Sequence, residues 1–247
     1  MVKSKIYYIR RDVIPIFYAL TDIGKKRLAN EDFFAVKEFN NNCSIYMVLD
    51  GIGGSKSGNI ASSKTAERII NYLQNADNIN IDIVKNAILE ANKYIYDMSS
   101  TSDEYTGMGT TLVMLYKDDT GIYVLNIGDS RAYKITKTKF SQVSEDDTYV
   151  NALVKDKIIT KEEALVHPDR HVLLKAIGVA KEVSPNIIKE SSKEFLLCTD
   201  GLTVATKEED IYSVIKNNNP EDICPLLIKL ANDNGGQDNI TVMYVKF

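Results

Sequence analysis

The segment TLVMLYKDDTGIYVLNIGDSRAYKIT, Thr111–Thr136, decides the fold class of this chain. Runs rich in Val, Ile, Leu and Tyr follow one another with only short polar stretches between them, which is typical of β-strands. Links this short join antiparallel strands, because a parallel crossover needs about a dozen residues or more. We therefore expect antiparallel hairpins at both turns, Asp119–Gly121 and Asp129–Ser130.

Strand-like segments recur along the chain, and helical patterns lie in separate groups. The strands are expected at Ile16–Thr21, Phe33–Glu38, Ile45–Leu49, Thr110–Tyr116, Ile122–Ile127, Ala132–Ile135, Phe195–Thr199 and Ile240–Lys246. Two long helical patterns fall between the third and fourth of these strands, and two more are expected at Lys207–Lys216 and Pro220–Asn232. In the second long pattern the apolar residues keep helical spacing, at Val84, Ala87, Ile88, Ala91 and Ile95. This grouping predicts an α+β fold, a sheet core with helices outside, and not a doubly wound parallel sheet.

The composition is that of an ordinary globular protein. With 247 residues, 44% of them hydrophobic, the chain can bury a sizeable core in one or two domains. A net charge of −4 argues against general affinity for nucleic acid or anionic membranes, because binding to phosphates needs clustered Lys and Arg. No run approaches the ~20 apolar residues of a membrane span, and the N-terminus lacks a signal-peptide pattern. We expect a soluble cytoplasmic protein. Its cysteines, Cys43, Cys198 and Cys224, are too few and too scattered for a disulfide framework or a zinc site, and Cys43 and Cys198, in or beside predicted strands, are expected to be buried thiols.

The segment Glu145–Gly178 differs from its surroundings. It is polar and helix-forming and lacks strand signals, so it is predicted to be an insertion between strands. It also holds both histidines, His167 and His171. Their spacing of four residues fits a metal site, but Pro168 directly after His167 favours the end of a helix there. We therefore expect no metal ligation by these histidines.

Acidic residues stand at the ends of several predicted strands. Asp50, Asp129 and Asp200 each follow an apolar run, and Asp238 precedes the last one. In an antiparallel sheet the end of one strand lies beside the start of its neighbour, so these carboxylates are expected to gather at one rim of the fold. Carboxylates that close repel one another unless a cation lies among them, and oxygen ligands without Cys or His favour Mg²⁺ or Mn²⁺. The alternative is that each Asp merely forms a turn.

The glycine-rich stretch Gly51–Gly54 after Asp50 allows a second interpretation, a loop that binds a nucleotide phosphate. Such a loop needs a parallel βαβ unit and a G-x4-G spacing before its lysine, and the chain lacks that spacing. The antiparallel grouping of the strands weakens this interpretation further. A sharp turn that leaves a backbone carbonyl near a metal accounts for the glycines instead.

Six short motifs occur in the order that is found in one protein family: RLANED at Arg27–Asp32, VLDGIGG at Val48–Gly54, GTTL at Gly109–Leu112, IGDSRAY at Ile127–Tyr133, CTDGL at Cys198–Leu202 and GGQDNITV at Gly235–Val242. By these motifs the chain resembles, over nearly its whole length, the metal-dependent protein phosphatases of the PPM (type 2C) family, in particular the compact bacterial members. The resemblance implies one domain over residues 1–247, a four-layer α-β-β-α sandwich of two antiparallel sheets flanked by helices. Residues 145–178 would form the flap subdomain, which we expect to influence substrate choice because it is an insertion close to the metal rim.

The resemblance also implies a centre of two tightly bound Mn²⁺ or Mg²⁺ ions at one end of the sandwich. By the motifs, Asp50 bridges both ions and the carbonyl of Gly51 binds the second. Asp200 and Asp238 bind the first ion. Glu31 supports the second site through water.

Two further roles and two departures follow from the same comparison. Arg27 matches the arginine that grips the substrate phosphate, and Asp129 matches the aspartate that, with Asp200, holds a third, weaker ion in bacterial relatives. Ile52 stands where many eukaryotic relatives carry a histidine that is assigned as general acid, and Ile52 cannot transfer a proton. In the flap the common Asp-His-Thr becomes Asp146–Thr148, which we expect to alter flap contacts and not the chemistry.

The resemblance therefore predicts a phosphatase that hydrolyses phosphoserine and phosphothreonine on proteins by attack of a metal-bridging water or hydroxide. The expected partners are phosphorylated proteins and a bacterial-type Ser/Thr kinase that the enzyme opposes, and the expected state is a monomer. The alternative is a pseudophosphatase, a regulatory module that binds phosphoproteins without turnover. Loss of a metal carboxylate would mark that alternative, and none is lost.

Overall fold

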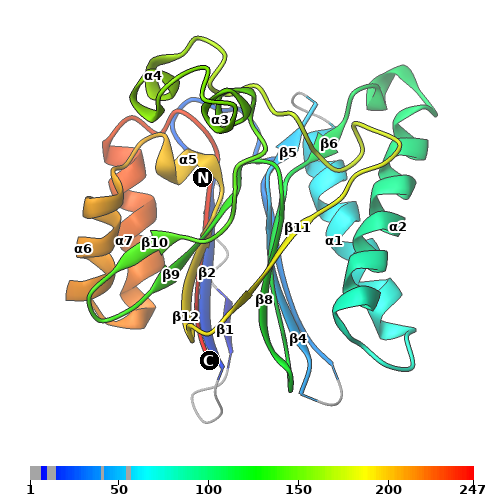
Figure 1. Ribbon diagram of the computed structural model, residues 1–247, viewed down its shortest axis with the longest axis horizontal. Helices are drawn as coiled ribbons and strands as arrows, with labels where there is room; N and C mark the ends of the chain where they lie inside the picture. The colour runs from blue at the N-terminus through cyan, green and yellow to red at the C-terminus, as the bar shows by residue number, and fades with distance from the viewer. Residues whose placement is uncertain (1–6, 10–14, 40–41, 54–56) are drawn as a thin grey trace.

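Two antiparallel sheets face each other at the centre of the molecule, and helices cover the outer face of each (Figure 1). The computed structural model describes residues 7–9, 15–39, 42–53 and 57–247. Gly54, the last residue of the glycine-rich stretch, lies outside the described residues. This arrangement confirms the predicted four-layer α-β-β-α sandwich.

Every strand pairing in the sheets is antiparallel. The first sheet has the order β1 (Tyr7–Ile9), β2 (Ile16–Asp22), β13 (Ile240–Lys246), β12 (Glu194–Cys198), β9 (Arg131–Ile135) and β10 (Phe140–Gln142). The second has the order β11 (Asn186–Glu190), β8 (Gly121–Ile127), β7 (Leu112–Asp118), β4 (Ser44–Leu49) and β3 (Phe33–Glu38). A small separate pair is formed by β5 (Gly51–Ile52) and β6 (Gly109–Thr110).

The helices fall into the two predicted groups. α1 (Gly58–Gln74) and α2 (Ile81–Ser99) lie against the second sheet, and α6 (Glu208–Asn217) and α7 (Pro220–Asp233) lie against the first (Figure 1). A single turn of helix, α5 (Asp200–Thr203), follows β12 directly. A short 3₁₀ turn, Asp103–Tyr105, follows α2.

Three apolar layers hold the sandwich together. One lies between the second sheet and α1 and α2, one between the two sheets, and one between the first sheet and α6 and α7. The side chains on α2 that were predicted to face the core are all buried: Val84, Ala87, Ile88, Ala91 and Ile95. Cys43 and Cys198 are buried thiols, as expected, and Cys224 is buried as well.

The prediction of two consecutive hairpins is half wrong. β7 and β8 do form a hairpin, with Asp118 opposite Gly121, but β8 and β9 belong to different sheets. The turn at Asp129–Ser130 is therefore a crossing from one sheet to the other. Gly128 makes the crossing possible, because its φ of +92° suits glycine, and an added Cβ would lie 2.7 Å from the methyl group of Thr111.

The strand that was expected at Thr110–Tyr116 is also divided. Thr110 belongs to β6, which pairs with β5, and the long strand β7 begins only at Leu112. The break allows the chain at Thr111 to turn toward the end of β4, where its amide donates to the carbonyl of Asp50. The edge strands β1, β10 and β11 were not predicted.

The flap is the insertion that the sequence predicted. It lies over one end of the sandwich, on the side of the first sheet (Figure 1). It contains α3 (Tyr149–Lys155), capped by Thr148, and α4 (Lys161–Val166), whose Thr160 and Glu163 form a capping box. α4 ends at His167, as expected from Pro168. Within the ranges that the structure describes, no helix is both long and apolar enough to cross a bilayer.

A large-to-small change at Ile88 tests the packing of α2 on the second sheet. Ile88 is fully buried, so Ile88→Ala leaves a cavity and should lower the free energy of unfolding by about 2–5 kcal/mol, measured by urea titration. Asn86→Ala, at an exposed position on the same helix, is the matched control and should change it by less than about 0.5 kcal/mol. Equal effects of the two changes would contradict the predicted contact.

Candidate active site

A cavity of about 590 Å³ opens at the end of the sandwich beside the flap. Every residue predicted for the site lines it: Arg27, Glu31, Asp50, Gly51, Asp129, Asp200 and Asp238. They come from both sheets, because β4, β8 and β12 end here and β13 begins here. The structure thus brings together the acidic strand ends that the sequence places far apart.

Hydroxyl groups fix the backbone around Asp50. The carbonyl of Asp50 accepts from the hydroxyl of Thr110 at 2.9 Å, and its amide donates to Oγ1 of Thr111 at 3.0 Å. Oγ1 of Thr111 lies 2.6 Å from Oγ of Ser130, the residue after Asp129. One buried threonine thus ties together the turns that carry Asp50 and Asp129. The GTTL motif was recognised in the sequence, but its role was not.

Asn239 holds the loop that carries Arg27 and Glu31. Its side-chain amide donates to the carbonyls of Ile23 and Ala29 at 3.0 and 2.9 Å, and its Oδ1 accepts from the amide of Glu31 at 2.9 Å. A buried asparagine with its amide group fully used fixes a loop without adding charge. Sequence reasoning singled out its neighbour Asp238 and missed Asn239.

Gly51 is required by close backbone contact. An added Cβ at Gly51 would lie 2.2 Å from the carbonyl oxygen of Gly58 and 2.6 Å from that of Glu31. The glycine therefore lets the start of α1 and the Glu31 loop approach the strand end. This close approach gives a more specific reason for the glycine than the sharp turn that was predicted.

Asp32 joins the two sheets beneath the cavity. Its Oδ2 accepts from the hydroxyls of Thr199 at 2.9 Å and Thr241 at 2.7 Å, at the end of β12 and the start of β13. Burial raises the pKa of Asp32 to about 7, against these two hydrogen bonds, which favour the charged form. Asp32 therefore acts as a buried cross-link immediately next to Glu31.

The carboxylates at the cavity raise one another's pKa values. Burial, and then the charges of Asp32 and Asp200, raise the pKa of Asp50 well above its ordinary value. Burial and the charge of Asp200 raise the pKa of Asp129 to about 7. Burial and the charge of Asp238 raise the pKa of Asp200, although a hydrogen bond with Asp50 works in the opposite direction. Negative charge is therefore costly here unless a cation offsets it.

Arg27 supplies a positive charge at the cavity. Its Nη2 donates to Oδ2 of Asp238 at 2.7 Å, and the guanidinium is about half exposed. The ion pair joins the residue predicted to hold the substrate phosphate to a residue predicted to hold a metal. Both groups are therefore present in the cavity and already in contact.

The donor set fits a hard divalent cation. Oε1 of Glu31, Oδ1 of Asp32 and Oδ1 of Asp200 are buried and accept no hydrogen bond in the described part of the protein. Buried carboxylate oxygens without a donor favour a cation as partner, and oxygens are the ligands that Mg²⁺ and Mn²⁺ prefer. In the same described ranges, no three His, Cys, Asp or Glu side chains already form a group that could hold a metal ion.

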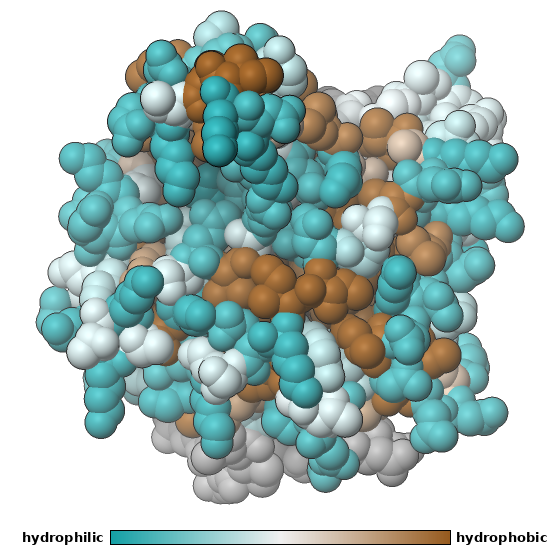
Figure 2. All heavy atoms as spheres, in the orientation of Figure 1, coloured by the Kyte–Doolittle hydropathy of each residue, from teal (hydrophilic) through white to brown (hydrophobic). Residues whose placement is uncertain are grey.

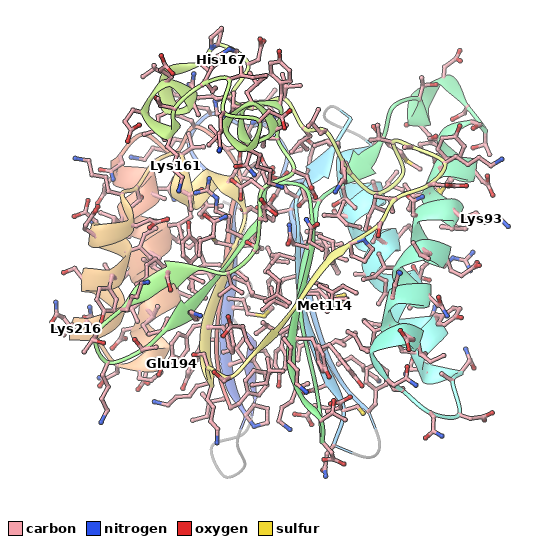
Figure 3. The ribbon with its side chains drawn as sticks, viewed as in Figure 1. Lys93, Met114, Lys161, His167, Glu194 and Lys216 are labelled. Atoms are coloured by element: carbon pink, nitrogen blue, oxygen red, sulfur yellow. The ribbon has the colours of Figure 1, made fainter. Side chains whose placement is uncertain are left out.

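The flap adds residues that the sequence did not assign to the site. Arg170 and His171 line the cavity, whereas His167 lies on the upper surface of the flap, away from it (Figure 3). Asp147, one of the departures from the family pattern, accepts from Nζ of Lys175 at 2.8 Å and from the amide of Gly128 at 3.2 Å. Asp147 thus links the flap to the turn before Asp129, and the expectation that the departure alters flap contacts and not the chemistry stays a prediction.

Comparison with known proteins identifies the family. Residues 24–235 match the family model described as protein phosphatase 2C. The chain belongs to this family. It is 35% identical to the serine/threonine phosphatase stp of Listeria monocytogenes, over 92% of this chain and 93% of that protein. The family resemblance that the six motifs indicated is confirmed.

Solved structures support the same assignment. The serine/threonine phosphatase of S. agalactiae superposes with a TM-score of 0.88 at 32% identity, covering 94% of this chain and 99% of that one. The catalytic domain of the serine/threonine protein phosphatase PstP, solved with two manganese ions, has a TM-score of 0.81 at 27% identity, covering 94% of this chain and 97% of that one. This member of the protein phosphatase 2C family is therefore a metal-dependent protein phosphatase, and the comparisons do not support the pseudophosphatase alternative.

The raised pKa of Asp129 predicts a pH-dependent stability of the metal-free phosphatase. The folded protein holds this proton more tightly than the unfolded chain, so the stabilising contribution is full below about pH 4 and is lost as the pH rises through about 7. Asp129→Asn removes the titration. In EDTA, the free energy of unfolding of the variant relative to wild type should therefore rise between about pH 4 and pH 8, by about 4 kcal/mol.

Urea unfolding at a series of pH values measures this difference. Asp97→Asn, at an exposed position on α2, is the control and should show no such trend. A difference between Asp129→Asn and wild type that stays constant with pH would contradict the prediction.

Proposed function

We propose that this protein removes phosphate from phosphoserine and phosphothreonine residues of proteins, with Mn²⁺ or Mg²⁺ as its metal. The observation that carries the proposal is the cavity at the end of the sandwich, where acidic oxygens from both sheets stand beside the guanidinium of Arg27. Such a set suits a phosphomonoester, which needs its negative charge neutralised and its nucleophile positioned. The similarity to serine/threonine phosphatases supports the same substrate class.

Different residues of the chain would bind the two tight ions. Asp50 is close enough to Asp129, Asp200 and Asp238 for their charges to raise its pKa, and it would hold both tight ions, with Asp200 and Asp238 on the first. The carbonyl of Gly51 and the side chain of Glu31 would serve the second. When bound, the ions supply the positive charge and the acidified water that phosphomonoester hydrolysis requires.

Arg27 would bind and orient the phosphate. Its planar guanidinium can donate two parallel hydrogen bonds to phosphoryl oxygens, which the ammonium of a lysine cannot reproduce. It pairs with Asp238 now, so a cation bound at Asp238 would compete for that carboxylate and leave Arg27 free for substrate. The flap residues Arg170 and His171 complete the wall and help to exclude water.

Asp129 would have a larger part here than in relatives with a histidine at position 52. Ile52 lines the cavity but cannot donate a proton to the leaving group. Asp129, with Asp200, would hold a third, weaker ion, because two carboxylates offset the dehydration of an ion less well than four. The alternative for Asp129 is a residue that only shapes the turn.

We further propose that residues 1–247 act as one catalytic domain, as a monomer in the cytoplasm, and oppose a bacterial-type Ser/Thr kinase. The family match over residues 24–235 supports a single catalytic unit. The acidic net charge of −4 argues against nucleic acid and anionic membrane surfaces as partners.

Metal removal and loss of one ligand should abolish turnover. Phosphothreonine peptide is assayed with Mn²⁺, with EDTA, and with Asp200→Asn in Mn²⁺. Activity is expected only in the first case, because the second lacks the ion and the third lacks a carboxylate that holds it. Asp97→Asn on α2 is the control for the charge change and should keep full activity. Equal rates in all conditions would refute the proposed function.

Loss of Asp129 should separate metal binding from turnover. Asp129→Ala is expected to keep the fold and the two tightly bound ions, and to lose on the order of 10²-fold in turnover of phosphopeptide, as expected when a proton-transfer step is impaired. Bound metal is counted by elemental analysis of the same sample that is assayed at saturating Mn²⁺. Unchanged turnover with two bound ions would reduce Asp129 to a turn residue.

A further inference from the structure

A second hollow lies directly beside the active-site cavity, between the flap and α5. Its volume is about 900 Å³. We call it the flap groove and define it by its apolar residues Leu165, Val166 and Val204 and its cations Lys161 and Arg170. Figure 3 shows Lys161 on the lower side of the flap, toward the helices beneath it. The groove is therefore formed by the flap on one side and the phosphatase core on the other.

The flap groove and the active-site cavity form one continuous surface. They share the residues Asp129, Arg170, His171, Asp200 and Val204. A phosphoresidue that reaches into the cavity leaves its own backbone at the cavity mouth, so the residues on one side of it must lie over an adjoining surface. An extended chain advances about 3.3 Å per residue, so a few residues suffice to enter the groove.

The groove exposes apolar side chains on a segment that the sequence marked as polar. Leu165 is 75% exposed, Val166 80% and Val204 52%. Brown apolar atoms are visible on the flap among the teal polar ones (Figure 2). Exposed apolar side chains gathered along one hollow are typical of a surface that binds another chain.

The charges in the groove are unequally satisfied. Asp146 pairs with Arg131 at 2.6 Å, and Glu145 pairs with Lys155 at 2.6 Å. Lys161 and Arg170, in contrast, form no ion pair with any residue in the described ranges. Glu145 and Asp146 are thus occupied, Asp129 and Asp200 lie at the end that the groove shares with the active-site cavity, and Lys161 and Arg170 are available to a ligand.

We propose that the flap groove binds the substrate polypeptide beside the phosphoresidue and selects an apolar residue accompanied by an acidic one. The apolar side chain packs on Leu165, Val166 and Val204, and the acidic side chain pairs with Lys161. This inference rests on the proposed function, because it assumes that a phosphoresidue occupies the adjoining cavity. It adds a sequence preference that the metal centre alone does not provide.

Phosphothreonine peptides test the preference. In an alanine background, leucine is placed at one position at a time on either side of the phosphothreonine, with and without an adjacent glutamate. One position on one side should raise kcat/KM about tenfold, mainly through KM, because one well-placed apolar side chain gives discrimination of this order. The adjacent glutamate should raise it several-fold more.

Variants locate the preference in the groove. Leu165→Ser combined with Val166→Ser should remove the effect of leucine, and Lys161→Glu should reverse the effect of glutamate. The matched controls are Ile158→Ser, an exposed apolar residue of the flap outside the groove, and Lys181→Glu, an exposed lysine outside it. Each kcat/KM is divided by that of the same variant for a small aryl phosphate, which corrects for any change in folding or in the metal centre.

The outcomes distinguish this inference from the proposed function. If wild type hydrolyses neither the peptides nor the aryl phosphate, the proposed function is wrong and the inference falls with it. If it hydrolyses all peptides at one rate, or if the groove variants keep the preference, only the inference is overturned. A change of oligomeric state in the groove variants, measured by analytical ultracentrifugation, with the preference intact would assign the groove to a second copy of the chain instead.

Discussion

Mutual repulsion of carboxylates is the constraint on which the rest of this structure depends. Asp50, Asp129, Asp200 and Asp238 meet where two sheets end, and burial together with their neighbours' charges raises the pKa values of the first three. The groups that hold this end together are mostly neutral. Threonine and serine hydroxyls and one asparagine amide fix the backbone and leave the negative charge in place. The fold therefore keeps the acidic oxygens in position for a cation without supplying enough positive charge of its own.

The ion pair of Arg27 with Asp238 links the negative charge of the cavity to the binding of a metal and a phosphate. Within hydrogen-bonding distance of Asp238, it offsets part of the local charge in the absence of metal. The pair is partly exposed, so it is weak and is readily exchanged. A cation bound at Asp238 would replace Arg27 as the partner of that carboxylate. A phosphate bound at Arg27 would replace Asp238 as the partner of the guanidinium. Metal and substrate would then strengthen each other's binding, since each removes a competitor for the other.

Much of the fold was predictable from local patterns, because those patterns act within single elements. The helical spacing on α2 reports one buried face, and the continuous apolar runs of β4 and β13 report strands that are buried on both faces; these elements were predicted correctly. The crossing at Gly128 was not, because a two-residue turn has the same sequence signature whether it joins strands of one sheet or of two. The difference lies in a contact with Thr111, which is distant in the sequence and invisible in the turn itself.

The residues of the site were also predicted only in part. Charged residues at strand ends are conspicuous in a sequence, so the acidic set was found, and all of it lines one cavity. The residues that position it, Thr111 and Asn239 among them, are ordinary polar residues whose importance comes only from what they contact. The exposed apolar side chains of α4 were missed for a related reason. A polar average over the flap conceals Leu165 and Val166, which are side by side in the sequence and become a surface only through the fold.

The flap and the turn that carries Asp129 are held together by the same hydrogen bonds. Asp146 receives a bidentate pair of hydrogen bonds from Arg131, two residues after Asp129. Asp147 exchanges hydrogen bonds with Gly128, the residue before Asp129, and pairs with Lys175 at the far end of the flap. The base of the flap is therefore fastened on both sides of the residue that would hold the weakest ion. A movement of the flap large enough to break these contacts must also loosen the turn of Asp129. The flap groove and this turn are therefore coupled by the same few hydrogen bonds.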